Sequence, residues 1–123
     1  MTTFYPSLRY RDARAAIEWL ERAFGFEPNM VVDGEGDQVV HAQLGFGDGM
    51  IMLGSERDDQ FGTHLGQSWA YVAVEGDIDA HCERARAAGA EIVREPEDQD
   101  YGSRDYSARD LEGNLWSFGT YRP

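Results

Sequence analysis

The sequence has one cysteine, no lysine and no long apolar run. Cys82 has no second cysteine with which to form a disulfide inside the chain, so a reducing cytoplasm is the simplest environment. No apolar stretch approaches the roughly 18 residues of a membrane-spanning helix, and the first residues lack the pattern of a signal peptide. We therefore expect a cytoplasmic protein with no membrane partner.

Positive charge is scarce as well. The 11 basic residues, all of them arginines, stand against 23 acidic residues, which gives a formal net charge of −12. Nucleic-acid binding depends on clustered cations that neutralise phosphates, so this balance argues against a nucleic-acid partner. The acidic field would favour a cationic ligand, although an acidic surface that only maintains solubility is the more common case.

A length of 123 residues with 41% apolar content suits one domain, 1–123, with a real core. Its first part, a module of about 1–54, contains one amphipathic segment and several short apolar runs. Asp12 is a typical helix N-cap, and Gly25 is typical of the residue that ends a helix. The strands predicted around that helix are Phe4–Tyr10, Phe26–Asp33, Val39–Phe46 and Met50–Leu53.

The same order of elements then recurs. Residues 55–67 are polar, contain two glycines, and are predicted to be a linker or a mobile loop. A second module, about 68–123, has a helix capped by Asp77 or Asp79 and ended by Gly89. Its predicted strands are Ser68–Val74, Glu91–Arg94, Arg104–Ala108 and Leu115–Tyr121, with a loop over Pro96–Gly102.

The two modules superpose at a fixed offset. Gly25 and Gly89 are 64 residues apart, and so are Gly49 and Gly113. Glycines that end helices and form turns, repeated in step with the same element order, indicate an internal duplication. The sequence therefore predicts an α+β fold made of two β-α-β-β-β modules.

The last predicted hairpin carries a recognisable pattern: Tyr101-Gly102-Ser103-Arg104, an aromatic residue, then Asp110-Leu111-Glu112-Gly113-Asn114 and an aromatic strand. With the duplication, it resembles the vicinal oxygen chelate superfamily of glyoxalases, bleomycin-resistance proteins and extradiol dioxygenases. Leu111 stands where that family usually has proline. The resemblance covers nearly the whole chain, and implies that each module forms half of a curved mixed-sheet trough.

The resemblance also implies four positions for metal ligands. In the family's enzymes, histidine and glutamate side chains from the first and last strands of each module hold a divalent ion on the trough floor. The corresponding residues here are Tyr5, Trp69, Ser117, and either Met52 or Leu53. An indole nitrogen only donates, a phenol ionises near pH ~10, a thioether is soft, and serine is a poor ligand. We expect no metal and no other cofactor.

Three histidines remain as candidates for other chemistry: His41 in a strand, His64 in the linker and His81 on the second helix. No pair has the i, i+4 spacing of two ligands on one helix. A structural or pocket-lining role is expected for His41, which would be the one candidate general base if it titrates. No nucleophile motif is present, so no catalytic residue is assigned.

Aromatic and apolar side chains replace the metal ligands, as in the bleomycin-resistance branch of the family. Members of that branch are metal-free dimers that sequester a drug in grooves between subunits, which implies an aromatic groove for a flat or cationic ligand. Many such aromatics are ordinary core residues, and Arg104 could form an internal ion pair instead of contacting a ligand. The expected ligand-binding residues are Tyr5, His41, Phe46, Met52, Trp69, Tyr101, Arg104, Tyr106, Trp116 and Ser117.

Three functions follow from these observations. The first is a metal-free homodimer of the bleomycin-resistance type that binds and sequesters a small molecule, such as a cationic or aromatic antibiotic. The second is a glyoxalase-type metal-dependent lyase or dioxygenase with relocated ligands. The third is a scaffold or regulatory domain whose trough is filled by its own side chains.

Overall fold

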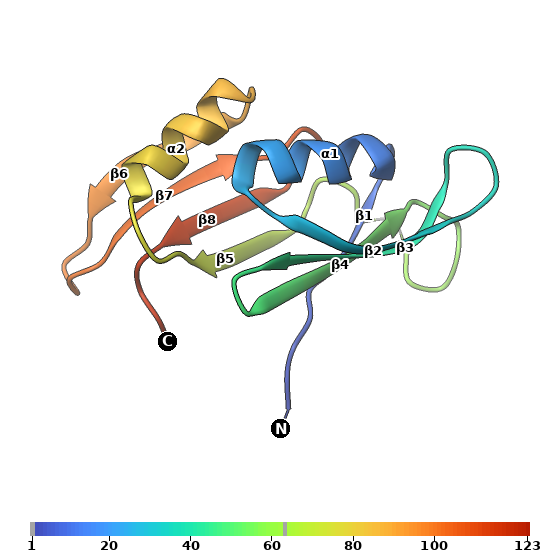
Figure 1. Ribbon diagram of the computed structural model, residues 1–123, viewed down its shortest axis with the longest axis horizontal. Helices are drawn as coiled ribbons and strands as arrows, with labels where there is room; N and C mark the ends of the chain where they lie inside the picture. Colours follow the sequence, from blue (N-terminus) through green and yellow to red (C-terminus); the bar gives the residue numbers. More distant parts are fainter. Residues whose placement is uncertain (1, 63) are drawn as a thin grey trace.

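The computed structural model describes residues 2–62 and 64–123, and consists of two helices packed on two four-stranded sheets (Figure 1). Module one contains β1 (Ser7–Tyr10), α1 (Ala13–Phe24), β2 (Glu27–Asp33), β3 (Val39–Phe46) and β4 (Gly49–Ser55). Module two contains β5 (Trp69–Ala73), α2 (Ile78–Ala87), β6 (Glu91–Asp98), β7 (Arg104–Arg109) and β8 (Leu115–Gly119). The order β-α-β-β-β occurs twice, which confirms the predicted fold.

The two sheets have the same topology. Sheet A has the strand order β1-β4-β3-β2, and sheet B has the equivalent order β5-β8-β7-β6. In each sheet the first and last strands of the module pair in parallel, and the other neighbours are antiparallel. Neither helix, within the described residues, is long and apolar enough to cross a membrane.

Both helices begin and end where the sequence predicts. The carboxylate of Asp12 accepts a hydrogen bond from the Ala15 amide at 3.0 Å, and Asp77 caps α2 in the same way through Ala80. Such caps each contribute about 1 kcal/mol. Gly25 closes α1 with φ of 89°, a left-handed conformation that glycine adopts without strain.

The first strand begins at Ser7 and the last ends at Gly119, so both are shorter than predicted, and the largest difference from the prediction lies in β6. Strand β6 extends to Asp98 and includes Pro96, where the sequence predicted the start of a loop. Because β6 is the edge strand of sheet B, and its pairing with β7 is irregular between Arg94 and Glu97, the missing amide hydrogen of proline removes no ladder bond there. The proline rule therefore placed the end of this strand too early.

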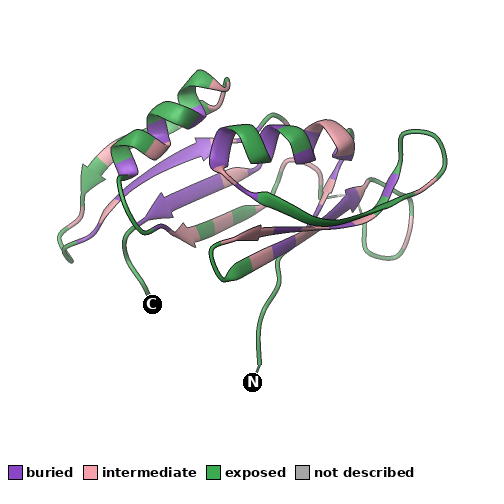
Figure 2. Cartoon of the chain, in the orientation of Figure 1, coloured by how far each residue is buried: buried purple, intermediate pink, exposed green. Residues whose placement is uncertain are grey.

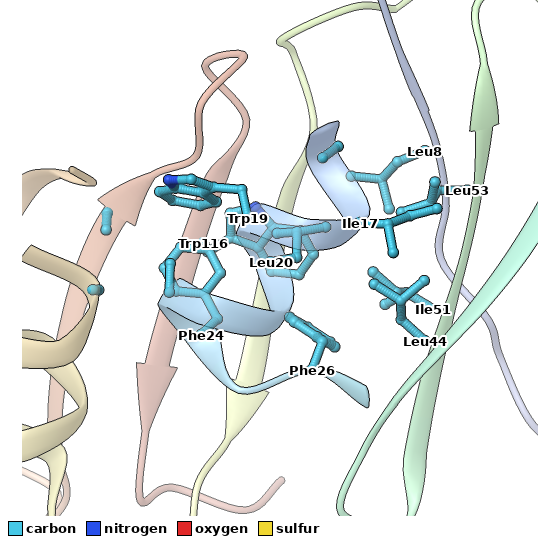
Figure 3. Close-up of a cluster of buried hydrophobic side chains, with 14 of the residues drawn as sticks. Leu8, Ile17, Trp19, Leu20, Phe24, Phe26, Leu44, Ile51, Leu53 and Trp116 are labelled. Atoms are coloured by element: carbon cyan, nitrogen blue, oxygen red, sulfur yellow. The ribbon is translucent and has the colours of Figure 1, made fainter. Parts of the chain in front are cut away.

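Helix α1 packs against both sheets and joins the modules. Ile17 and Leu20 contact sheet A, and Phe24 packs on sheet B, with ring centroids 4.7 Å from Phe118 (Figure 3). The indole Nε1 of Trp19 donates to the carbonyl of Ala88 in module two at 2.8 Å. Full burial of one large apolar side chain contributes about 2–3 kcal/mol, so α1 supplies much of the shared core.

The closing turn of module two, Asp110–Asn114, also contacts module one. The buried Asp110 carboxylate accepts hydrogen bonds from the Tyr10 hydroxyl at 2.6 Å and from the Trp116 indole at 3.1 Å. The Glu112 carboxylate accepts from the backbone amides of Arg11 and Asp12, where β1 leads into α1. The turn pattern that carries the family resemblance thus holds the two modules together.

Strand alternation leaves each sheet with a second face that no helix covers, here called its open face (Figure 2). The open face of sheet A carries Ser7, Arg9, Met30, Val32, His41, Gln43, Met50 and Met52. The open face of sheet B carries Trp69, Tyr71, Asp105, Ser107, Leu115 and Ser117. No hydrogen bond or ion pair between described residues joins side chains of the two open faces.

Candidate ligand-binding site

Sheet B presents an exposed indole on its open face. Trp69 is 72% exposed, although it belongs to a strand. Its Nε1–H donates to Ser117 Oγ at 3.1 Å, and Ser117 Oγ lies 2.8 Å from Ser107 Oγ. A large apolar ring held in place and left in solvent is a common feature of binding surfaces.

Tyr71 lies beside this indole and is placed by a glycine. Its hydroxyl donates to the backbone carbonyl of Tyr121 at 2.7 Å, and partial burial raises its pKa. The Tyr71 ring lies across Gly119, where an added Cβ would be 2.9 Å from the hydroxyl oxygen. Tyr121 in turn packs edge-on against Tyr101, with centroids 5.3 Å apart. The side chains of Trp69, Tyr71, Tyr121 and Tyr101 therefore form a continuous group on and beside the open face of sheet B.

The buried carboxylate of Asp105, on this face, is paired within the protein. Asp105 is buried, and its Oδ1 accepts from the guanidinium of Arg94 at 2.7 Å and from the Gln99 amide at 3.1 Å. Burial of an unpaired polar group is costly, and these two donors offset that cost for the Asp105 side chain. The Asp105 carboxylate beside the aromatic surface is therefore already occupied by donors from the protein's own side chains.

The open face of sheet A has a different character. All three methionines after Met1 lie on it, at positions 30, 50 and 52. His41 and Gln43 follow each other along the same face, and His41 Nε2 lies 3.1 Å from Gln43 Nε2. Thioethers are flexible and polarisable, so this face can adapt to different apolar shapes.

The linker covers one end of sheet A. Arg9 donates to both carboxylate oxygens of Asp59 at 2.8 and 2.7 Å and to the carbonyl of Gly62 at 2.9 Å. The Phe61 ring lies 5.8 Å from the guanidinium carbon of Arg9. The hydrogen bond from Arg9 lowers the pKa of Asp59 to about 2. A hollow of about 400 Å³ lies between β1 and this loop, lined in part by Ser7 and Phe61.

Three of the expected ligand-binding residues lie on the helix side of their sheets. Tyr106 and Trp116 are fully buried, so the expectation that they line a groove is wrong. Phe46 packs with Phe26 on the same side, at a centroid distance of 5.4 Å, and does not reach an open face. The reason is alternation: Trp116 and Ser117 are adjacent in β8, and adjacent strand residues point to opposite faces.

The other expected residues are more dispersed. Met52 and His41 lie on the open face of sheet A, and Trp69 and Ser117 on that of sheet B. Tyr5 precedes β1 and is about half exposed, and Tyr101 lies in the exposed loop after β6. Arg104 forms a two-point ion pair with Asp79 and a further one with Asp98, so the internal pairing is the one observed.

The structure also assigns the fourth metal-ligand position. Ser7 in β1 is equivalent to Tyr71 in β5, since the two are 64 residues apart. Ser7 pairs with Met52 and Tyr71 pairs with Ser117, so Met52 is the equivalent of Ser117, whereas Leu53 is buried in the core. Met52 and Ser117 are 65 residues apart, because the β7–β8 turn is one residue longer than the β3–β4 turn. The donor set is therefore Tyr5, Met52, Trp69 and Ser117, in which Trp69 and Ser117 are already bonded to each other. This set does not fit a divalent ion.

The remaining histidines have other surroundings. His81 donates from Nε2 to the Phe24 carbonyl and accepts at Nδ1 from the Tyr106 hydroxyl, and its burial lowers its pKa. His64 lies in the linker with φ of 46°. Among the described residues, no three His, Cys, Asp or Glu side chains cluster as metal ligands would.

Sequence reasoning missed Ser107, Tyr121 and the place of Tyr71. A signal for Ser107 was available, because Tyr106 and Ala108 alternate with it as core residues of β7. Tyr121 lies after the last strand, where periodicity gives no information. Tyr71 was separable from the core aromatics only through its register with Ser117.

Comparison with known proteins identifies the family. The profile of the Glyoxalase/Bleomycin resistance protein/Dioxygenase superfamily matches residues 3–118. The crystal structure of TioX from Micromonospora sp. ML1 is 34% identical, with a TM-score of 0.82 over 99% of this chain and 100% of that one. A Mycobacterium bovis protein of uncharacterised function, Mb0911c, is 31% identical over 93% of this chain and 80% of its own length. A glyoxalase/bleomycin resistance protein/dioxygenase from Nocardioides shares the fold at 19% identity and a TM-score of 0.68, covering 97% of this chain and 83% of that one. The chain belongs to the Glyoxalase/Bleomycin resistance protein/Dioxygenase superfamily.

Proposed function

We propose that this protein binds and sequesters a small molecule without a metal, as bleomycin-resistance proteins do. The observation that carries the proposal is Trp69. Its indole is 72% exposed and hydrogen-bonded to Ser117, and both residues stand at positions where the family's enzymes have metal-coordinating side chains. An indole in that position binds by stacking, which a flat aromatic or cationic compound satisfies. An antibiotic of that kind is the proposed ligand, and resistance by sequestration in the cytoplasm is the proposed role.

The proposed active form is a homodimer with two grooves. Within one chain, α1 packs against the same side of both sheets, and the open faces point away from it (Figure 3). Each chain therefore offers two separate half-sites, one rich in methionine and one rich in aromatic residues. Pairing the open face of sheet A with the partner's open face of sheet B would enclose a ligand between thioethers and rings.

Charge supports a ligand that is not anionic. The net charge is −12, and two of the arginines on or beside the open faces, Arg9 and Arg94, are paired with Asp59 and Asp105. An acidic surface field raises the local concentration of cations and repels anions. The ring faces of Trp69 and Tyr71 would add a cation–π contribution for a positively charged ligand.

Thermal denaturation in the presence of candidate ligands tests the proposal. Bleomycin-like glycopeptides, aromatic cations and peptide antibiotics form the screen, and a ligand at 100 times its Kd stabilises the native state by about 2.7 kcal/mol. Trp69→Ala is expected to abolish that stabilisation. The matched control is Leu111→Ala, which removes another exposed apolar side chain in a turn away from the open faces. No stabilisation by any compound would contradict the proposal.

Elemental analysis distinguishes the alternative function. His41 is an imidazole on an open face, so a glyoxalase-type lyase or dioxygenase with relocated ligands is the rival to test. One equivalent of zinc, nickel, manganese or iron in protein purified without chelator would favour that enzyme. Sedimentation of the native protein as a monomer at working concentration would separately remove the dimer from the proposal.

A further inference from the structure

The floor beside Trp69 contains a hydroxyl proton that no group of residues 2–62 and 64–123 accepts. Ser117 Oγ accepts the indole N–H and shares one hydrogen bond with Ser107 Oγ. Two hydroxyls have two protons, and one hydrogen bond between them uses one. Whichever serine donates to the other, the second proton has no acceptor among the described residues.

The serine hydroxyl with the spare proton is nearly buried, so the direction in which it can donate a hydrogen bond is restricted. Ser107 and Ser117 are each 7% exposed, and alternation in β7 and β8 directs both side chains to the open face. Buried polar groups are nearly always hydrogen-bonded, so an unpaired donor at the floor of a surface marks a place for an acceptor from outside. Access is only from the open face, next to the indole.

We propose that the Ser107–Ser117 hydroxyl pair donates a hydrogen bond to an acceptor atom on the edge of a planar ligand stacked on Trp69. This inference rests on the proposed binding function and narrows its ligand class. The ligand is a flat ring system with a carbonyl oxygen or ring nitrogen at its edge. The hydroxyl pair thereby recognises a ligand atom at the position where metal-dependent relatives would use a cation.

Other donor groups near the indole each make a hydrogen bond within the protein. The Trp69 N–H is held by Ser117, the guanidinium of Arg94 by Asp105, and Arg109 donates to the Gly113 carbonyl at 3.1 Å. The serine pair differs from both arginines in position, because its hydroxyls lie at the floor directly beside the indole N–H. The same bond from Trp69 to Ser117 fixes the edge of the indole at the floor and turns its ring face toward the ligand.

The orientation of the indole is tested first, without ligand. Trp19 and Trp116 are buried in the core, so fast local motion of an indole, measured by fluorescence anisotropy decay, reports mainly on Trp69. Ser117→Ala is expected to increase the fast component of Trp69 anisotropy decay. The matched control is Ser103→Ala, which removes another buried hydroxyl, one that has no hydrogen-bond partner. Identical decay in wild type and Ser117→Ala would overturn the orienting role.

The donor is tested with an isosteric pair of probes, quinoline and naphthalene, which differ by one ring nitrogen. Ligand-observed NMR in the millimolar range should give quinoline about fivefold tighter binding, as expected for one neutral hydrogen bond. Trp69→Phe should keep this ratio, because both hydroxyls remain. Adding Ser107→Ala and Ser117→Ala to that variant should reduce the ratio to about one, since neither hydroxyl of the floor is then left.

The outcomes separate the two proposals. Equal binding of both probes to the wild-type protein would overturn the donor and leave the binding function standing. A ratio that survives removal of both hydroxyls would also overturn it. Failure of both probes to bind would contradict the proposed function and this inference together.

Discussion

The two modules have the same backbone topology and different open faces. On the helix side both sheets are apolar and closely packed against α1 or α2. On the open side, sheet A presents methionines and a His41–Gln43 pair, whereas sheet B presents Trp69, Tyr71 and two linked serines. Stability therefore resides mainly on one side of each sheet. The other side is free to differ between duplicated halves, and it is there that we propose the ligand binds.

The largest loss of stability should come from truncating the side chain of module one that packs into the core of module two. Phe24 is fully buried on α1 and packs against Phe118 and Trp116 of module two. Phe24→Ala should reduce the free energy of unfolding by roughly 3–5 kcal/mol, measured by chemical denaturation. Trp69→Ala, a larger truncation on an open face, should change it by less than about 1 kcal/mol. Equal losses would contradict the division between the two sides.

A smaller effect is expected at the junction of the closing turn. Tyr10→Phe removes the hydroxyl that donates to Asp110 at 2.6 Å and leaves that buried carboxylate with fewer donors. The expected loss is about 1–3 kcal/mol of unfolding free energy. Tyr5→Phe, at a half-exposed tyrosine outside the strands, is the control and should have almost no effect. A loss no greater than the control's would mean that the turn does not hold the modules together.

His81 should make the contact between modules sensitive to pH. Burial lowers its pKa below the ordinary value of 6.5, so the unfolded chain binds the proton more readily than the folded protein does. Stability is therefore fully present above about pH 6.5 and should fall as pH drops below that value. Denaturation curves between pH 7.5 and 5 measure the slope, which His81→Gln should reduce. His64→Gln, in the linker, is the control and should keep the wild-type slope.

The smallest effect concerns the linker, which Arg9 of the open face of sheet A holds through Asp59 and Gly62. The pKa of Asp59 is lowered to about 2 by its hydrogen bond from Arg9, so their ion pair should persist until the pH falls through that value. Carbon-detected NMR should show Asp59 titrating near pH 2 in the wild type. In Arg9→Met its pKa should return toward the ordinary 3.8. An unchanged titration would mean that Arg9 does not anchor the loop.

The fold was largely predictable because its signals are local and repeated. Asp12, Gly25 and the 64-residue spacing of the glycines gave the helix ends and the duplication. The site was less predictable, because membership of an open face depends on strand parity. Trp116 and Ser117 were both expected in the groove, yet neighbours in a strand face opposite ways. The longer β7–β8 turn also shifts the repeat by one residue, which left Met52 and Leu53 undecided until the pairing was known.

Gly119 determines how deep the site can be. Since an added methyl group there would meet both the Tyr71 hydroxyl and the Asp105 side chain, the tyrosine can lie flat only while this position has no side chain. A single methyl at residue 119 would tilt the phenol outward and make the aromatic surface shallower. In the proposed site, the thickness of a bound ring is thus coupled to a residue at the end of β8 that need never touch it, so one substitution there could change which compounds fit.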